Sequence, residues 1–308
     1  MYEQGIDFDT GEMHQNLRAI SSERLGNQRS GAISPSGDYL AFVSEIPGDA
    51  LLHITNLVSG DTKVHDFVEF RRIQMRRFQA LTWSSDNTSV LFTTVDSNVQ
   101  PARLMFLSVN VQDGSFVELD DFEDIRVRSP GSLKGIGYSA DGKKVIFATL
   151  THLVEMNIKS KSQRVIHEFS ISDGTMESMS LSPDGQTAAV TWRPWDRTGD
   201  NSSIELVSIV DGSISKLNES GEELGYSQWV GISWTPNGKN LVFAENRPNQ
   251  GQQLYTINLE SGKRIAIGEP VFGDDQLMGV RVHPDGDKIT FFRGTRQLQL
   301  WVLEGIEL

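Results

Sequence analysis

The sequence contains no cysteine, which excludes disulfide bridges, thiol catalysis and zinc sites built from thiolates. Basic residues are also scarce: 28 Lys and Arg stand against 41 Asp and Glu, for a formal net charge of −13. This balance disfavours a nonspecific nucleic-acid binder, because such proteins normally carry a basic surface. No stretch approaches the roughly 18 consecutive apolar residues that cross a membrane as a helix. We therefore expect no nucleic-acid partner and no membrane span.

The N-terminus is acidic and lacks the basic, apolar and small-residue series of a signal peptide. As written, the chain is expected to be cytoplasmic, and the alternative is a periplasmic protein whose leader has been removed. Without cysteine to indicate the redox environment, the compartment cannot be assigned from composition.

Linear signatures of catalysis are missing as well. There is no Gly-x-Ser-x-Gly nucleophile elbow, no His-Glu-x-x-His zinc motif and no glycine-rich phosphate loop. The six His are scattered along the chain, so we expect no cofactor and no metal. This favours a protein that is not an enzyme. The alternative is a hydrolase or lyase whose site is assembled from several repeats and is invisible in linear spacing.

What the sequence does contain is a repeat. Residues 181–192 read LSPDGQTAAVTW: an apolar strand, a Ser-Pro-Asp-Gly turn and a second apolar strand. Proline presets φ and glycine accepts the left-handed conformation, so this tetrapeptide predicts a tight hairpin. Related turns begin at Ser34, Ser84, Ser139, Ser182, Thr235 and His283, about 50 residues apart, a period typical of solenoids, propellers or arrays.

Each repeat predicts four short strands, with tight turns between the first and second and between the third and fourth. This is the pattern of a β-propeller blade, and the near-continuous apolar second strands fit sheets that are buried on both faces. We therefore predict an all-β, six-bladed propeller forming one domain over residues 1–308. The predicted third strands are 51–56, 104–109, 153–157, 204–209 and 254–258, and the fourth strands are 62–66, 116–119, 164–167, 214–217 and 264–267.

The sixth repeat is short of a strand. Its third strand is predicted at 298–303, after which only 304–308 remain. The segment 16–20 precedes the first repeat as fourth strands precede the later ones, so we expect it to complete blade six and close the ring. Closure removes the free edges of an open array. Residues 6–12 look like a strand and turn from another blade, which would fit an accessory or sensor domain cut from a longer protein.

The Ser-Pro-Asp-Gly hairpins resemble the repeats of TolB-like β-propellers over roughly residues 15–303. Residues 246–249 (NRPN) before 253–258 (QLYTIN) are similar to that family's loop-and-strand signature, and 195–199 (WDRTG) before Ile204 is a second copy. The resemblance implies the propeller fold. It also implies periplasmic protein binding, as for TolB itself, or a sensor or accessory role. The helical N-terminal domain of TolB is absent from this sequence, which argues against the Tol–Pal role.

The two faces of the predicted ring differ. One carries the tight turns and eight of the ten Lys, whereas the other carries the longer loops and most of the Arg, together with aromatic residues. Long loops on a rigid scaffold usually hold the function, and Arg and aromatics are typical binding residues. We expect a monomer that binds a protein or peptide, with an acidic partner as one option, on this face or in the central channel. The predicted contact residues are Arg71, Arg72, Arg76, Arg77, Arg126, Arg193, Trp195, Arg197, Tyr226, Trp229, Arg247 and Arg296.

The alternative is that these Arg side chains pair internally. Acidic residues lie in the same predicted loops, and surface ion pairs of this kind contribute about 0–1 kcal/mol each. The candidates for such pairing are Asp120, Asp121, Glu123, Asp124, Glu222, Glu223, Asp274 and Asp275.

Overall fold

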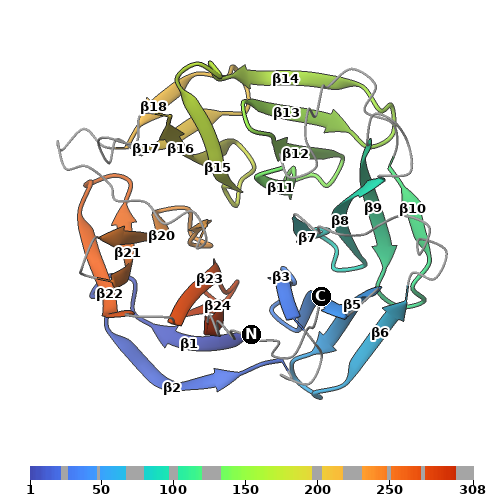
Figure 1. Ribbon diagram of the computed structural model, residues 1–308, viewed down its shortest axis with the longest axis horizontal. Helices are drawn as coiled ribbons and strands as arrows, with labels where there is room; N and C mark the ends of the chain where they lie inside the picture. The colour runs from blue at the N-terminus through green and yellow to red at the C-terminus, as the bar shows by residue number, and fades with distance from the viewer. Residues whose placement is uncertain are drawn as a thin grey trace, which may run out of the picture.

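The protein is a ring of β-sheets. The computed structural model describes residues 1–21, 27–46, 49–66, 80–96, 103–119, 133–195, 203–217, 231–247, 251–271 and 275–295. These residues form six four-stranded antiparallel sheets around a common axis (Figure 1). The predicted six-bladed β-propeller is confirmed. The described residues include no helix with the length and hydropathy of a membrane span.

Five blades are built from consecutive strands, with the first strand near the axis and the fourth at the rim (Figure 1). Blade 1 comprises β3 (Asn27–Ile33), β4 (Tyr39–Ile46), β5 (Asp49–Asn56) and β6 (Thr62–Asp66). Blade 2 comprises β7 (Leu81–Trp83), β8 (Ser89–Asp96), β9 (Arg103–Asn110) and β10 (Phe116–Glu118). Blade 3 comprises β11 (Gly135–Tyr138), β12 (Lys144–Ala148), β13 (His152–Asn157) and β14 (Gln163–Glu168). Blade 4 comprises β15 (Gly174–Leu181), β16 (Thr187–Pro194), β17 (Ser203–Ser208) and β18 (Ile214–Lys216). Blade 5 comprises β19 (Ile232–Trp234), β20 (Asn240–Arg247), β21 (Gly251–Asn258) and β22 (Arg264–Val271).

Blade 6 joins the two ends of the chain. It contains β23 (Asp275–Val282) and β24 (Lys288–Thr295), followed by β1 (Tyr2–Ile6) and β2 (Met13–Ala19) from the N-terminus. The predicted closure by an N-terminal strand is confirmed, but two strands close the ring rather than one. The third strand is β1, which pairs with β24, and not 298–303, which lie outside the described residues. The segment 6–12 belongs to this hairpin and not to a further blade. The sequence of β1, YEQGI, is largely polar, so an apolar pattern does not predict this strand.

Apolar side chains fill the space between neighbouring blades. The described core divides into six clusters, and each cluster combines residues of two adjacent blades. One cluster joins the ends of the ring, where Met1 and Phe292 of blade 6 pack with Leu40 and Phe42 of blade 1. Burial of this apolar surface between every pair of blades stabilises the closed ring.

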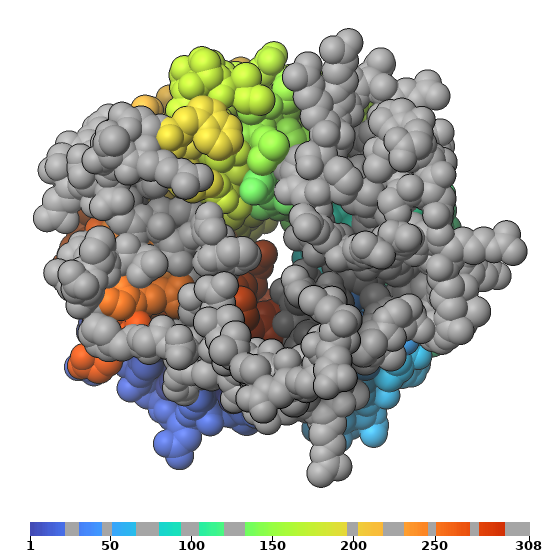
Figure 2. Space-filling model, viewed as in Figure 1, coloured from blue at the N-terminus to red at the C-terminus, as the bar shows by residue number. Residues whose placement is uncertain are grey.

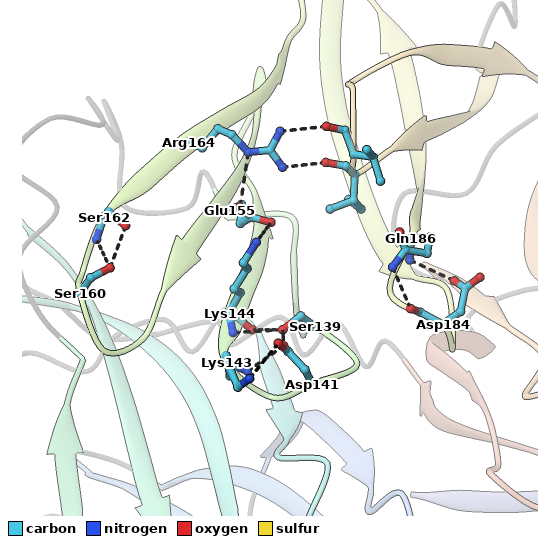
Figure 3. Close-up of polar contacts among 12 residues, drawn as sticks. Ser139, Asp141, Lys143, Lys144, Glu155, Ser160, Ser162, Arg164, Asp184 and Gln186 are labelled. Carbon is cyan, nitrogen blue, oxygen red and sulfur yellow. Dashed lines mark hydrogen bonds and ion pairs between the residues drawn. The ribbon is translucent and has the colours of Figure 1, made fainter.

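The repeated turn is held by its own side chains. In blade 4 the Ser182 hydroxyl donates to Asp184 at 2.6 Å, and Asp184 accepts the backbone N–H of Gln186 at 3.0 Å. Ser139 and Asp141 repeat the first contact in blade 3 (Figure 3). Hydrogen bonds from Ser182 and Gln186 keep the pKa of the Asp184 carboxyl below its usual value. The repeated Asp is therefore a structural residue of the turn, as local hydrogen bonding predicts.

Ionic side chains on the tight-turn face link blades 3 and 4. Arg164 donates to the carbonyls of Ile209 and Val210 in the next blade at 2.7 and 3.2 Å, and to Glu155 at 3.3 Å (Figure 3). Lys144 lies 3.1 Å from the same carboxylate. Arg164 thus fastens blade 3 to blade 4.

Candidate functional site

The face opposite the tight turns is called here the long-loop face. It carries the connections between second and third strands and those between blades. Two of these connections, 149–151 and 169–173, are described throughout, and both lie beside blade 4. In Figure 2 the yellow and yellow-green surface of blades 3 and 4 is uncovered on the viewed face.

The structure describes the side chains of two predicted contact residues, Arg193 and Trp195. Both lie where β16 reaches the long-loop face. Arg247 ends β20, and its side chain lies outside the described part of the chain. The remaining predicted contacts also lie outside it: Arg71, Arg72, Arg76, Arg77, Arg126, Arg197, Tyr226, Trp229 and Arg296.

Arg193 belongs to a cluster of three charged side chains. Its Nε donates to Glu177 Oε1 at 2.9 Å, and a terminal nitrogen lies 2.6 Å from the same oxygen. Lys134, from the strand entry of blade 3, lies 3.6 Å from Glu177 Oε2. The Glu177 side chain is only 8% exposed, whereas Arg193 is 34% and Lys134 18% exposed. One buried carboxylate therefore holds two more accessible cations, which leaves a net positive charge at this point of the face.

A β-bulge explains why Glu177 points toward these cations. The register of β15 against β16 shifts between Met176 and Ser178, so Glu177 is the extra residue of the innermost strand. Bulges locally break the ladder and redirect a side chain, and they occur often beside functional sites.

An exposed apolar pair lies in the same region. The indole N–H of Trp195 donates to the Ile171 carbonyl at 2.5 Å, which ties the end of β16 to the connection between blades 3 and 4. Both side chains remain in contact with solvent, at 49% exposure for Trp195 and 59% for Ile171. Two aromatic residues of the same segments, Phe169 and Trp192, are buried and stack with ring centroids 4.8 Å apart. The indole hydrogen bond thus holds an exposed Trp195 in a fixed position.

Sequence reasoning identified Arg193 and Trp195 but not Lys134, Glu177 and Ile171. The one available signal was Glu177 itself, a carboxylate within an otherwise small and apolar strand, GTMESMSL. Arg193 does form an ion pair within the chain, as the alternative interpretation predicted. Its partner comes from a strand and not from the acidic loops, because the bulge could not be predicted from the sequence.

Two hydroxyl–imidazole pairs occur among the described residues. In the first, Thr151 Oγ1 lies 2.9 Å from Nδ1 of the adjacent His152, whose Nε2 lies 3.5 Å from Glu168, and Thr151 is only 9% exposed. The second pair is Ser44 and His53. Ser44 and His53 Nε2 lie 2.7 Å apart, but the two residues are 0% and 1% exposed, and the imidazole stacks on Phe42 at 4.7 Å. A catalytic pair must reach substrate, so this pair is part of the core. No group of three or more His, Asp or Glu suited to a metal ion occurs within the described residues.

Comparisons with known proteins find similarity in structure only. No protein-family model and no curated protein matches the chain. It is similar to putative TolB from Agrobacterium tumefaciens over 94% of this chain and 98% of that one, with a TM-score of 0.66 and 17% identity. TolB from Acinetobacter baumannii gives a TM-score of 0.61 and 17% identity, over 87% of this chain but only 64% of that one. An oligogalacturonate lyase in complex with manganese gives 0.60 and 13%, over 91% of this chain and 80% of that one. At such identities the shared feature is the fold.

Proposed function

We propose that this chain, whose fold is that of a TolB-like six-bladed β-propeller, binds a protein or peptide on its long-loop face. The observation that carries the proposal is Trp195, exposed yet fixed by its indole hydrogen bond beside an exposed isoleucine and a partly exposed arginine. Tryptophan and arginine dominate the binding energy of protein interfaces, and fixed side chains lose little entropy on binding.

The charge cluster indicates the chemistry of the partner. Glu177 occupies only part of the donor capacity of Arg193 and Lys134, because a guanidinium has five N–H donors and an ammonium three. Both cations retain donors for a second carboxylate, which favours a partner with an acidic side chain or a free C-terminus next to an apolar residue. The remaining predicted Arg residues of this face would extend the same surface.

Two alternatives accompany this proposal. The chain could be an accessory or sensor domain of a larger protein, in which case the same face would bind another domain. It could also be a lyase or hydrolase with a site assembled across blades, and a manganese-bound lyase is among the similar folds. Metal analysis of the purified protein, with a chelator control, would separate binding from metal-dependent catalysis: a stoichiometric metal held by His would favour the enzyme.

The proposal is tested by selecting peptides from a random display library on the wild-type ring and then measuring the binding of each enriched peptide to Trp195→Ala. We expect enriched peptides to carry Asp or Glu beside an aromatic or aliphatic residue. Reversal of Arg71, Arg72, Arg76 and Arg77 to Glu should weaken the same peptides without unfolding the ring. Enrichment of basic peptides, or of peptides that the variant retains equally, would contradict the proposed site.

A further inference from the structure

A pocket of about 550 Å³ lies between blades 5 and 6, where the N-terminal hairpin closes the ring. Buried apolar side chains line it, including Leu254, Leu277 and Phe291. Met13 and Leu17 of β2, 43% and 41% exposed, line it from the rim of blade 6. Its volume falls within the roughly 300–1,000 Å³ of pockets that hold small organic molecules. It involves no residue of the proposed partner site.

Bulges in two neighbouring rim strands border this pocket. In blade 5 the register between β21 and β22 shifts so that residues 268–270 lie opposite Gln253 alone. In blade 6 the register between β1 and β2 shifts so that residues 15–17 lie opposite Gln4 alone. Such bulges bend a strand and break its ladder. Residues of both bulges line the pocket: Leu17 from β2, and Gly268, Glu269 and Pro270 from β22.

The two glutamines fill the bulges in the same way. Gln4 Nε2 donates to the carbonyls of Gly5, His14 and Gln15 at 3.3, 3.0 and 3.0 Å. Gln253 Nε2 makes the corresponding contacts in blade 5. Carbonyl oxygens only accept, so these contacts fix the amide orientation with nitrogen toward the bulge. Gln4 is 7% exposed and lines the pocket, and its Oε1 accepts no hydrogen bond from the described residues. This acceptor is the polar group that Gln4 offers a ligand.

Glu269 supplies the other polar group. It is the charged residue among those that line the pocket, it lies in the exposed bulge of β22, and it forms no ion pair with the described residues. The pocket thus combines an apolar floor with two acceptors, one of them anionic, and no cationic side chain lines it. A ligand complementary to this lining has an apolar body and a positively charged donor. The chain's net charge of −13 attracts the same kind of molecule.

We propose that the pocket between blades 5 and 6 binds a small amphiphilic cation. Its apolar body lies against Leu254, Leu277 and Phe291, and its protonated amine is held by the Glu269 carboxylate, with Gln4 Oε1 as a second acceptor.

The test compares three probes of equal chain length, n-octylamine, octanoate and 1-octanol, by isothermal titration calorimetry at pH 7 below their aggregation concentrations. We expect octylamine to bind at least tenfold more tightly than the other two probes, because only the amine satisfies both acceptors. Glu269→Gln should lower the octylamine affinity about tenfold. Glu260→Gln, which changes an exposed carboxylate in the tight turn of the same blade, should leave it unchanged.

A pocket-filling variant provides an independent control. Leu17→Trp changes an exposed side chain at the mouth of the pocket, so folding should persist and octylamine binding should be lost. Circular dichroism would confirm that the ring is intact. The proposal is overturned if octylamine does not bind, if octanoate or octanol binds equally well, or if Glu269→Gln and Leu17→Trp both retain wild-type affinity.

Discussion

At the residue scale, Asn87 replaces the glycine found at the same turn position in five repeats. Its φ is 61°, in the left-handed region where glycine is favoured. Its side chain compensates, because Oδ1 accepts the backbone N–H of Ser36 in the neighbouring blade at 3.0 Å. The glycines at this position are Gly37, Gly142, Gly185, Gly238 and Gly286.

We therefore predict that Asn87→Ala destabilises the ring by about 1–2 kcal/mol, since it loses the hydrogen bond and keeps the unfavourable φ. Asn87→Gly loses the same hydrogen bond but removes the unfavourable left-handed conformation, so its free energy of unfolding should lie within about 0.5 kcal/mol of that of the wild type. Urea denaturation measures both variants. Equal destabilisation by Ala and Gly would show that the backbone conformation makes no contribution.

His53 gives the core a dependence on pH. Burial holds the pKa of its imidazole below the ordinary value of 6.5, so the unfolded chain takes up this proton before the folded ring does. Its contribution to stability is present above about pH 6.5 and is lost as the pH falls below that value. Burial also lowers the pKa of His65 and His283, which add to the same trend.

We predict that His53→Gln, which keeps an amide for Ser44 but does not titrate, flattens the fall in stability between about pH 7.5 and 5.5. One proton changes the free energy of unfolding by at most about 1.4 kcal/mol per pH unit. Melting temperatures across this range measure the effect, with the exposed His14→Gln as control. A slope unchanged in His53→Gln but reduced in His14→Gln would contradict the assignment.

At the scale of elements, the N-terminal hairpin packs against blade 5 through its turn. Gly11 has a φ of 76°, and a Cβ added there would lie 2.1 Å from the carbonyl oxygen of Ala266 in β22. Gly262, at the equivalent turn of blade 5, has a φ of 66° and open space around it. The two glycines thus share a backbone conformation and differ in whether a neighbouring blade lies against them.

Gly11→Ala should therefore lower the free energy of unfolding by clearly more than Gly262→Ala does. Gly262→Ala, the control, should destabilise the protein by only the about 1–2 kcal/mol of a left-handed alanine. Gly11→Ala must in addition displace the hairpin from β22. We expect a larger drop in melting temperature for Gly11→Ala, and association of the protein on size-exclusion chromatography if β24 becomes a free edge. Equal melting temperatures for the two variants would contradict the observed docking of the hairpin.

The sequence predicts elements better than the places where pairing departs from regularity. The six turns and most third and fourth strands follow from local signals, because Pro, Asn and Gly act on their own backbone. The strand β1 was missed because its Glu3, Gln4 and Gly5 are buried by tertiary pairing and not by apolar character. The bulges that present Glu177 and admit Gln4 depend on register between strands, which no local pattern encodes.

At the scale of the whole molecule, the ring separates stability from recognition. On the tight-turn face Asp side chains hold the turns and Arg164 contacts the next blade, whereas the described edge of the long-loop face presents Trp195, Ile171 and two partly exposed cations. The N-terminal hairpin closes the ring, and the indole hydrogen bond holds Trp195 in place before a partner binds. The proposed amphiphile pocket lies on the closure seam, apart from that face.

The central claim is that Trp195 and Arg193 contact the partner, and it is tested by the dissociation constants of wild type, Trp195→Ala, Arg193→Gln and Val165→Ala for a peptide selected on the wild-type ring. Val165 is 50% exposed on the rim of blade 3 and serves as the matched apolar control. We predict that the Trp195 and Arg193 variants each weaken binding about tenfold or more, as loss of an interface anchor does, while Val165→Ala stays within about twofold. Equal affinities for all four proteins would place the partner elsewhere and contradict the account.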